Sequence, residues 1–347
     1  MALVAAAVAP AGASAADRVV ATVDAPTHVS GYAGGLVWSA RDPATGRFAL
    51  MYTDPAYPAA ALPVPQRSVP FDADLGPGPN ATPWIVYSRC KTEPPLSTPL
   101  SNSTVYTQGR GCRLYRFDVT SGEESAVGPA PKRASDVLPS VWKGRIAFSR
   151  VYDSRRNFPY LFGATSGGHT AHRLPAGPRR GCTTNPGAKR VCGDRTRSLP
   201  TALDLRGTKL ALAWEYKGTL DAPASEIRLI DTRRLASRVV DRVRGGGLTN
   251  IERVAPNFDG SSLYFARLCL GDQSGCPHRA ALVRYSTSTR KLSFAPIDRG
   301  DIWQTRTGGT TYLLRDSMFD HLCHPFDGPQ SATCRILGTN PVYRSAI

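Results

Sequence analysis

The sequence predicts an all-β fold in which six four-stranded antiparallel sheets form a closed ring, a six-bladed β-propeller. Three observations predict it. The 32 glycines and 29 prolines are spread along the 347 residues as punctuation between many short elements. Short apolar strands recur in a fixed order, and no segment has a helical periodicity of useful length. A chain of this length with 41% hydrophobic residues can also bury a large core.

The repeating unit is a glycine-containing turn followed by three strand-like segments. The fourth unit contains KLALAWEY, EIRLIDT and RVVDRV, and the fifth contains SSLYFARL, AALVRYST and KLSFAPI. The turn glycines Gly207, Gly260 and Gly308 are 53 and 48 residues apart, close to the roughly 40 to 50 residues of a propeller blade. Segments such as RIAFSRVY are apolar on both faces, which favours sheets packed between neighbouring sheets.

The other units follow the same order. The first contains GLVWSAR and RFALMYT, the second TPWIVYSR and CRLYRFDV, the third WKGRIAFSR and YLFGATSGG, and the last TTYLLR and CRILG. We therefore expect one propeller domain over residues 16–347, with blades at about 27–75, 82–130, 137–177, 198–244, 251–298 and 300–347.

Ring closure is predicted to involve the N-terminal strand. The segment DRVVATVD, residues 17–24, has no partner in the first unit, and the last unit lacks an outermost strand after CRILGTN. We expect the N-terminal strand to fill that place. The C-terminal segment VYRSAI is the competing candidate.

One segment resembles a known repeat. VAPNFDGSSLYFARL followed by ALVRYSTSTRKLSFAPI is similar to the repeat of TolB-like β-propellers, with Asp259-Gly260 and Arg206-Gly207 in the turn and Asp118 and Asp231 at the end of the later strand. The similarity covers the second to fifth units well and the first and last loosely. It implies the propeller fold. We expect the propeller alone, without the companion domain that such repeats often accompany, and the sequence contains no Gly-x-Ser-x-Gly nucleophile motif.

The first fifteen residues predict export. They are uncharged and apolar and end in Ala13-Ser14-Ala15, a pattern that signal peptidase cleaves. The basic start of a signal peptide is missing, so residues 1–15 are interpreted as a truncated signal peptide, with a disordered alanine-rich leader as the alternative. No other segment reaches the roughly 18 apolar residues of a membrane span. We expect a secreted or extracytoplasmic protein.

Eight cysteines predict four local disulfides. An even number of cysteines in an exported protein favours disulfides. The repeat brings pairs to neighbouring strand ends, which predicts the bonds Cys90–Cys112, Cys182–Cys192, Cys269–Cys276 and Cys323–Cys334. The alternative is a metal site at DHLCHPFD, where Asp320, His321, Cys323, His324 and Asp327 lie together. Because Cys323 has a partner in Cys334, we expect no metal and no cofactor.

Arginine dominates the charge. The net charge of +16 comes from 36 arginines and seven lysines against 27 acidic residues, and a positive field concentrates polyanions near the surface. In an antiparallel blade, the loop after the second strand and the connection to the next blade share one face. All four cysteine-bracketed insertions belong to these loops, and we call this face the loop side.

The loop side is the predicted binding face. Second strands end there in Arg41, Arg89, Arg150, Arg267 and Arg315, and the insertion between blades three and four carries Arg179, Arg180, Lys189 and Arg190. These residues either form a positive collar for an anionic partner or bridge neighbouring blades. The candidates for anion binding are Arg89, Arg150, Arg267, Arg315, Arg179, Arg180, Lys189 and Arg190.

The predicted function is that of an exported, non-catalytic binding or scaffolding protein. Its partner would be an anionic polymer of the cell surface or a protein. The alternative is a hydrolase or lyase that acts on an anionic polysaccharide at the channel mouth, and a third possibility is an assembly partner similar to TolB in role. No phosphate-binding loop or nucleotide fingerprint is present. We expect a monomer that does not bind nucleic acid.

Overall fold

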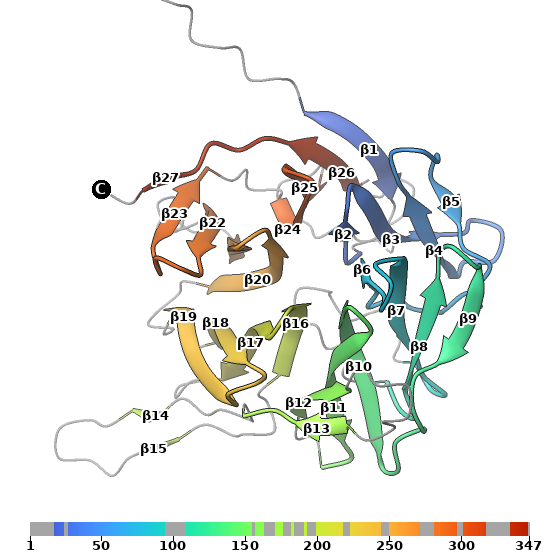
Figure 1. Ribbon diagram of the computed structural model, residues 1–347, viewed down its shortest axis with the longest axis horizontal. Coiled ribbons are helices and arrows are strands. Elements are labelled where there is room, and N and C mark those ends of the chain that lie inside the picture. The colour runs from blue at the N-terminus through green and yellow to red at the C-terminus, as the bar shows by residue number, and fades with distance from the viewer. Residues whose placement is uncertain are drawn as a thin grey trace, which may run out of the picture.

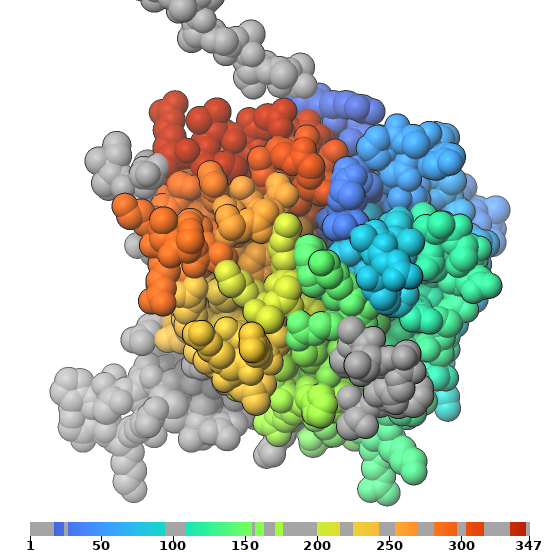
Figure 2. Space-filling view, in the orientation of Figure 1, coloured from blue at the N-terminus to red at the C-terminus, as the bar shows by residue number. Residues whose placement is uncertain are grey.

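The computed structural model is a six-bladed β-propeller built from four-stranded antiparallel sheets (Figure 1). The structure describes residues 17–23, 27–93, 109–154, 157–162, 171–175, 182–183, 191–192, 199–217, 223–243, 250–270, 281–296, 301–316 and 334–345. The blades follow one another around the disc in chain order, as the colours of Figure 2 show.

Each blade is an antiparallel sheet whose first strand lies nearest the central channel. Blades one and two consist of β2 (Ser30–Tyr32), β3 (Gly35–Arg41), β4 (Phe48–Thr53) and β5 (Ala60–Ala61), and of β6 (Asp74–Pro77), β7 (Pro83–Arg89), β8 (Arg113–Asp118) and β9 (Glu123–Ala126). Blades three and four consist of β10 (Ala134–Trp142), β11 (Arg145–Tyr152), β12 (Asn157–Phe162) and β13 (Ala171–Arg173), and of β16 (Leu199–Arg206), β17 (Lys209–Lys217), β18 (Pro223–Asp231) and β19 (Ala236–Val243). Between them, β14 (Cys182–Thr183) and β15 (Val191–Cys192) form a separate two-stranded sheet.

The N-terminal strand closes the ring, as predicted. Blade six consists of β24 (Asp301–Thr307), β25 (Thr310–Asp316), β26 (Cys334–Thr339) and β1 (Arg18–Val23), which pairs antiparallel with β26 (Figure 1). Blade five consists of β20 (Asn250–Asp259), β21 (Ser262–Leu270), β22 (Ala281–Ser286) and β23 (Leu292–Ala295). The competing C-terminal segment forms β27 (Arg344–Ser345), which adds a fifth strand to blade five beside β23.

The turns between first and second strands need glycine. Gly207, Gly260 and Gly308 have φ values of 58°, 60° and 58°, a left-handed conformation that glycine adopts without steric cost. At the turn after the third strand, the Asp231 carboxylate accepts the backbone N–H groups of the next turn residues at 3.0 and 2.9 Å, as in an Asx turn. These two classes of turn share the face opposite the loop side, which we call the turn side.

The hydrophobic core lies between the blades. Tyr87, Phe148, Trp214 and Phe265 are fully buried, and each belongs to the second strand of its blade. Burying a large apolar side chain contributes about 1.5 to 3 kcal/mol. Because both faces of a sheet are covered by neighbouring sheets, the sequence shows apolar runs rather than strict alternation.

The described part of the chain contains no helix with the length and hydropathy that a membrane crossing requires.

Candidate functional site

A ring of polar side chains surrounds the central channel and joins each blade to the next. Its members are the side chains of Ser30, Asp74, Ser140, Asp204 and Asn257, and each accepts a hydrogen bond from a backbone N–H on the innermost strand of the following blade. We call these five residues the polar girdle. The donors are the N–H groups of Leu75 (3.1 Å), Val141 (2.8 Å), Leu205 (2.8 Å), Phe258 and Arg306 (2.7 Å).

The sixth joint of the ring, between blades six and one, is made differently. Each donor directly follows a girdle position on its own strand, so the sixth position is Thr305. The Thr305 hydroxyl is buried and has no hydrogen-bond partner among the described residues. Instead, the Gly34 N–H donates to the Thr307 hydroxyl at 3.1 Å, and the Trp303 indole N–H donates to the Val29 carbonyl at 3.0 Å.

Bulges in the innermost strands place the girdle residues. The pairing register shifts between Val137 and Ser140 in β10 and between Val254 and Asn257 in β20. In both bulges the residue before the proline has a positive φ, 51° at Leu138 and 52° at Ala255. A bulge bends the strand and redirects side chains. The short repeats VLPS (137–140) and VAPN (254–257) encode this geometry, and their shared proline is the signal in the sequence that points to the bulges.

Two girdle carboxylates, those of Asp74 and Asp204, interact electrostatically in the channel. Burial raises the pKa of Asp204 from 3.8 to about 8, with the charge of Asp74 as the next cause, and burial also raises the pKa of Asp74. The Ser140 hydroxyl hydrogen-bonds with both carboxylates, and the Ser30 hydroxyl donates to Asp74 at 2.6 Å. Two like charges in a desolvated channel favour retention of a proton. The pair therefore holds a proton near neutral pH.

The channel widens at the turn side into a cavity of about 190 Å³. Residues at the ends of all six innermost strands line it, and Trp142, Arg206 and Arg306 are among them. The Arg206 guanidinium lies 4.9 Å from the centre of the Trp142 ring, and its Nη1 donates to the Phe258 carbonyl at 3.3 Å. Arg306 pairs with Asp259 at 3.3 Å and lies 5.0 Å from the centre of the Tyr264 ring. Two arginines and the Trp142 ring thus line this mouth together with the carboxylates of Asp204 and Asp259.

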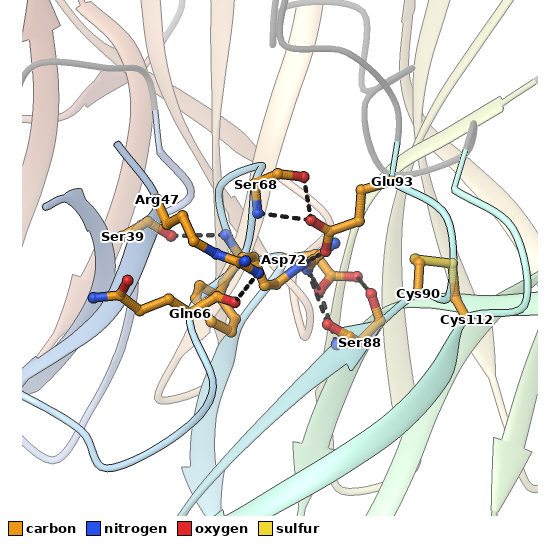
Figure 3. A network of polar contacts seen from close by, with 11 residues as sticks. Ser39, Arg47, Gln66, Ser68, Asp72, Ser88, Cys90, Glu93 and Cys112 are labelled. Carbon is orange, nitrogen blue, oxygen red and sulfur yellow. Dashed lines mark hydrogen bonds and ion pairs between the residues drawn. A yellow bond between two sulfur atoms is a disulfide. The ribbon is translucent and has the colours of Figure 1, made fainter. Parts of the chain in front are cut away.

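On the loop side, a buried arginine, Arg67, fixes the connection between blades one and two; Figure 3 shows Asp72 and Glu93 in the same polar network. Arg67 is 2% exposed and pairs with Glu93 at 2.7 Å and with Asp72 at 3.4 Å. Asp72 also accepts the N–H of Ser88 at 2.9 Å and the N–H of Leu138, in blade three, at 2.7 Å. The buried Asp72 carboxylate thus joins blades two and three. The Arg67 guanidinium, which comes from the segment that connects blades one and two, balances its charge.

The predicted disulfide Cys90–Cys112 is confirmed. It lies beside the Arg67 network and joins residues separated by 22 positions (Figure 3). Cys334 is also disulfide-bonded. Cys182 and Cys192 are register partners on β14 and β15, but their side chains, the side chain of Cys269, and residues Cys276 and Cys323 lie outside what the structure describes. The alternative metal cluster around His321 and His324 also falls outside the described residues.

All five predicted loop-side arginines lie at strand ends; Arg41 donates to the Gly46 carbonyl at 3.2 Å, and the other four are ion-paired. Arg89 pairs with Glu124 at 3.1 Å, Arg150 with Asp136 at 2.7 Å, Arg267 with Asp241 at 2.8 Å and Arg315 with Asp17 at 3.3 Å. The pair of Arg267 and Asp241 joins blades five and four. Arg179, Arg180, Lys189 and Arg190 lie outside the described residues. The anion-binding collar stays a prediction.

Comparisons with known proteins find similarity only among solved structures. No protein-family model and no curated protein matches the chain. Among solved structures, it is similar to TolB from Acinetobacter baumannii (13% identity, 90% of this chain and 66% of that chain, TM-score 0.45). It is also similar to an oligogalacturonate lyase from Vibrio parahaemolyticus (11% identity, 87% and 74%, TM-score 0.45) and to a puromycin-hydrolyzing peptidase from Mycobacterium tuberculosis (13% identity, 87% and 49%, TM-score 0.43).

The sheet topology shows that the chain is a six-bladed β-propeller, and TolB and TolB-like proteins are among the structures similar to it. It spans about two thirds of the length of the A. baumannii protein and half of the peptidase. At these identities the likeness concerns the fold and carries nothing about activity.

Proposed function

We propose that this chain is an exported, non-catalytic binding or scaffolding protein that recognises an anionic partner, such as a cell-surface polymer, at the turn-side mouth of its channel. The composition of that mouth carries the proposal, because Arg206, Arg306 and Trp142 line the cavity together. Guanidinium groups match carboxylate, sulfate and phosphate groups in shape and charge, and arginine and tryptophan are enriched at binding hot spots.

The role of the channel carboxylates supports binding over catalysis. Asp74 and Asp204 each accept a backbone N–H of the next blade, so they serve the packing of the ring. A general base must reach the proton that it abstracts, whereas one oxygen of each carboxylate already accepts a hydrogen bond from a backbone N–H. Export is supported by the Cys90–Cys112 disulfide, since disulfides persist in oxidising compartments.

The test is binding of the full chain to an array of acidic and neutral glycans at low and high salt. We expect retention of acidic glycans only, loss of binding at high salt, and weaker binding by the double variant Arg206→Ser, Arg306→Ser. Circular dichroism melting verifies that the variant is folded. Equal binding of neutral and acidic glycans, or no binding at either salt concentration, contradicts the proposal.

The second candidate is a hydrolase or lyase that acts on an anionic polysaccharide. The raised pKa of Asp204, next to Asp74 in the channel, favours it, because strongly perturbed carboxylates cluster at active sites. Incubation of the protein with the glycans that it binds, followed by chromatography of the products, separates the two functions. Cleavage that is lost in Asp204→Asn supports the enzyme, and intact glycans support the binding protein.

The loop side is the other place for an anionic partner. Binding that survives the Arg206→Ser, Arg306→Ser variant but is lost in Arg179→Ser, Arg180→Ser, Lys189→Ser, Arg190→Ser would assign the partner to the insertion between blades three and four. Single replacements of Arg89, Arg150, Arg267 and Arg315 by serine test the collar. These four arginines are ion-paired, so each variant also needs a melting curve.

A further inference from the structure

The turns of blades three to five carry a group of exposed cations on the turn side. They are Lys143 in blade three, Arg233 and Arg234 in blade four, and Arg290 and Lys291 in blade five. We call these five residues the basic turn surface. An excess of one sign of charge on one face directs the field of the protein toward a partner of the opposite sign.

Contacts between blades show that these turns lie next to one another. Arg145 of blade three donates to the Gly207 carbonyl at 2.6 Å and to the Thr232 hydroxyl at 2.8 Å, both in blade four. Lys209 of blade four donates to the Thr287 hydroxyl of blade five at 2.9 Å. The exposed cations therefore share one surface, although they come from three sheets.

The carboxylates on these turns are engaged locally. Asp231 accepts the backbone N–H groups of Arg233 and Arg234, and Asp259 pairs with Arg306. The acidic turn residues Asp54 in blade one and Asp118 and Glu123 in blade two belong to blades other than the three that carry the exposed cations. The exposed cations of the turn side thus lie on blades three to five and these acidic residues on blades one and two.

Exposed apolar side chains flank the basic turn surface. Leu235 is 56% exposed and directly follows Arg233 and Arg234 in the turn of blade four. Val342 is 69% exposed at the turn-side end of β26, next to Tyr343, whose ring packs against Tyr264 of blade five. A soluble polyanion gains little from aliphatic side chains, whereas the boundary between headgroups and acyl chains of a bilayer buries them.

We propose that the basic turn surface docks on an anionic lipid bilayer. The lysines and arginines contact headgroup phosphates, and Leu235 and Val342 enter the acyl boundary. Cations near a charged bilayer and inserted apolar side chains contribute additively to peripheral binding. This surface uses residues other than those of the channel mouth and goes beyond the binding of an acidic polymer.

The experiment is co-sedimentation of the full chain with vesicles of phosphatidylglycerol and phosphatidylcholine, compared with vesicles of phosphatidylcholine alone. We expect binding to the anionic vesicles that weakens with salt. The variant Arg233→Glu, Arg234→Glu should weaken it at least about tenfold, and Leu235→Ser with Val342→Ser should remove the binding that remains at high salt. A fold-change below about two in the charge variant overturns the proposal.

Two controls match these variants. Lys91→Glu with Lys132→Glu reverses two exposed charges on the loop side, and Tyr57→Ser removes a side chain that is 69% exposed on the turn side of blade one. Both should bind vesicles as the wild type does. Equal loss in Lys91→Glu, Lys132→Glu shows that only net charge matters and overturns the assigned surface.

The wild-type protein separates this proposal from the proposed function. Glycan binding without vesicle binding refutes the lipid surface and leaves the channel mouth standing, and vesicle binding without glycan binding does the reverse. Displacement of the protein from vesicles by a soluble acidic oligosaccharide, with no effect of Leu235→Ser, assigns the surface to a polyanion and refutes the bilayer.

Discussion

Replacing Asp204 with asparagine should reverse the order of stability between wild type and variant as the pH rises. Burial and the charge of Asp74 raise the pKa of Asp204 in the folded protein from 3.8 to about 8. A carboxyl group with a raised folded pKa is fully compatible with folding below its unfolded pKa. Its ionisation cost develops as the pH rises from about 4 to about 8 and is fully present above that.

The magnitude follows from the size of the shift. About four pKa units correspond to roughly 5 kcal/mol as an upper bound. Asp204 shares its titration with Asp74, so we expect about half of that value. Asparagine keeps an acceptor for the Phe258 N–H and removes the charge. The variant should therefore be no more stable than wild type at pH 5 and about 2 kcal/mol more stable at pH 9.

Urea unfolding followed by tryptophan fluorescence at pH 5, 7 and 9 measures the difference. Glu215→Gln is the matched control, because burial raises the pKa of Glu215 to about 8 at a different site, and it should remove a separate share of the pH dependence. If Asp204→Asn loses stability between pH 5 and pH 9 as steeply as wild type does, Asp204 is not the group that titrates and the reasoning is refuted.

Three further predictions concern the disulfide of blade two and the joints between blades. Replacing Cys90 and Cys112 with alanine should lower the free energy of unfolding by about 2 to 4 kcal/mol, measured by urea unfolding, and a reducing agent should then affect wild type more than the variant. Arg67→Met should cost about 3 to 5 kcal/mol, because it leaves the buried Asp72 carboxylate without its cation; the control Arg47→Met removes an exposed arginine that donates to the Gln66 carbonyl of the same connection and should leave the urea midpoint unchanged. In Gly76→Ala the new Cβ would lie 2.3 Å from the Val141 carbonyl oxygen, so thermal melting should show a loss of about 1 to 3 kcal/mol, and an unchanged melting curve would show that blades two and three can separate there.

The repeat of strands and turns could be predicted because residues close together in the sequence determine each strand and each turn. Gly207, Gly260 and Gly308 mark turns by their backbone requirement alone, and the N-terminal strand was predicted from an unfilled place in the last blade. The short innermost strands β2 (Ser30–Tyr32) and β6 (Asp74–Pro77) have too few residues for a hydrophobic pattern.

The candidate site was harder to predict, because its contacts join residues far apart in the chain. Ser30 and Leu75 meet only when blades one and two pack side by side. The sequence placed Arg150 and Arg267 at the loop-side ends of their strands, but it did not identify their partners Asp136 and Asp241. The sequence signal of the girdle is the proline that recurs in two of the bulges, at Pro139 and Pro256. This signal can be interpreted only once the bulges are known to face a channel.

The hydrogen bonds of the polar girdle all run in the same direction around the ring. Every acceptor belongs to one blade and its donor to the next blade along the chain. Each pair of neighbouring blades from one to six is therefore joined by its own hydrogen bond. Removal of one girdle side chain should weaken the contact between two blades and leave the other girdle hydrogen bonds in place. The joint between the first and last blades relies on Thr307 and Trp303 instead. It is the place where the two ends of the chain of blades meet and close the ring.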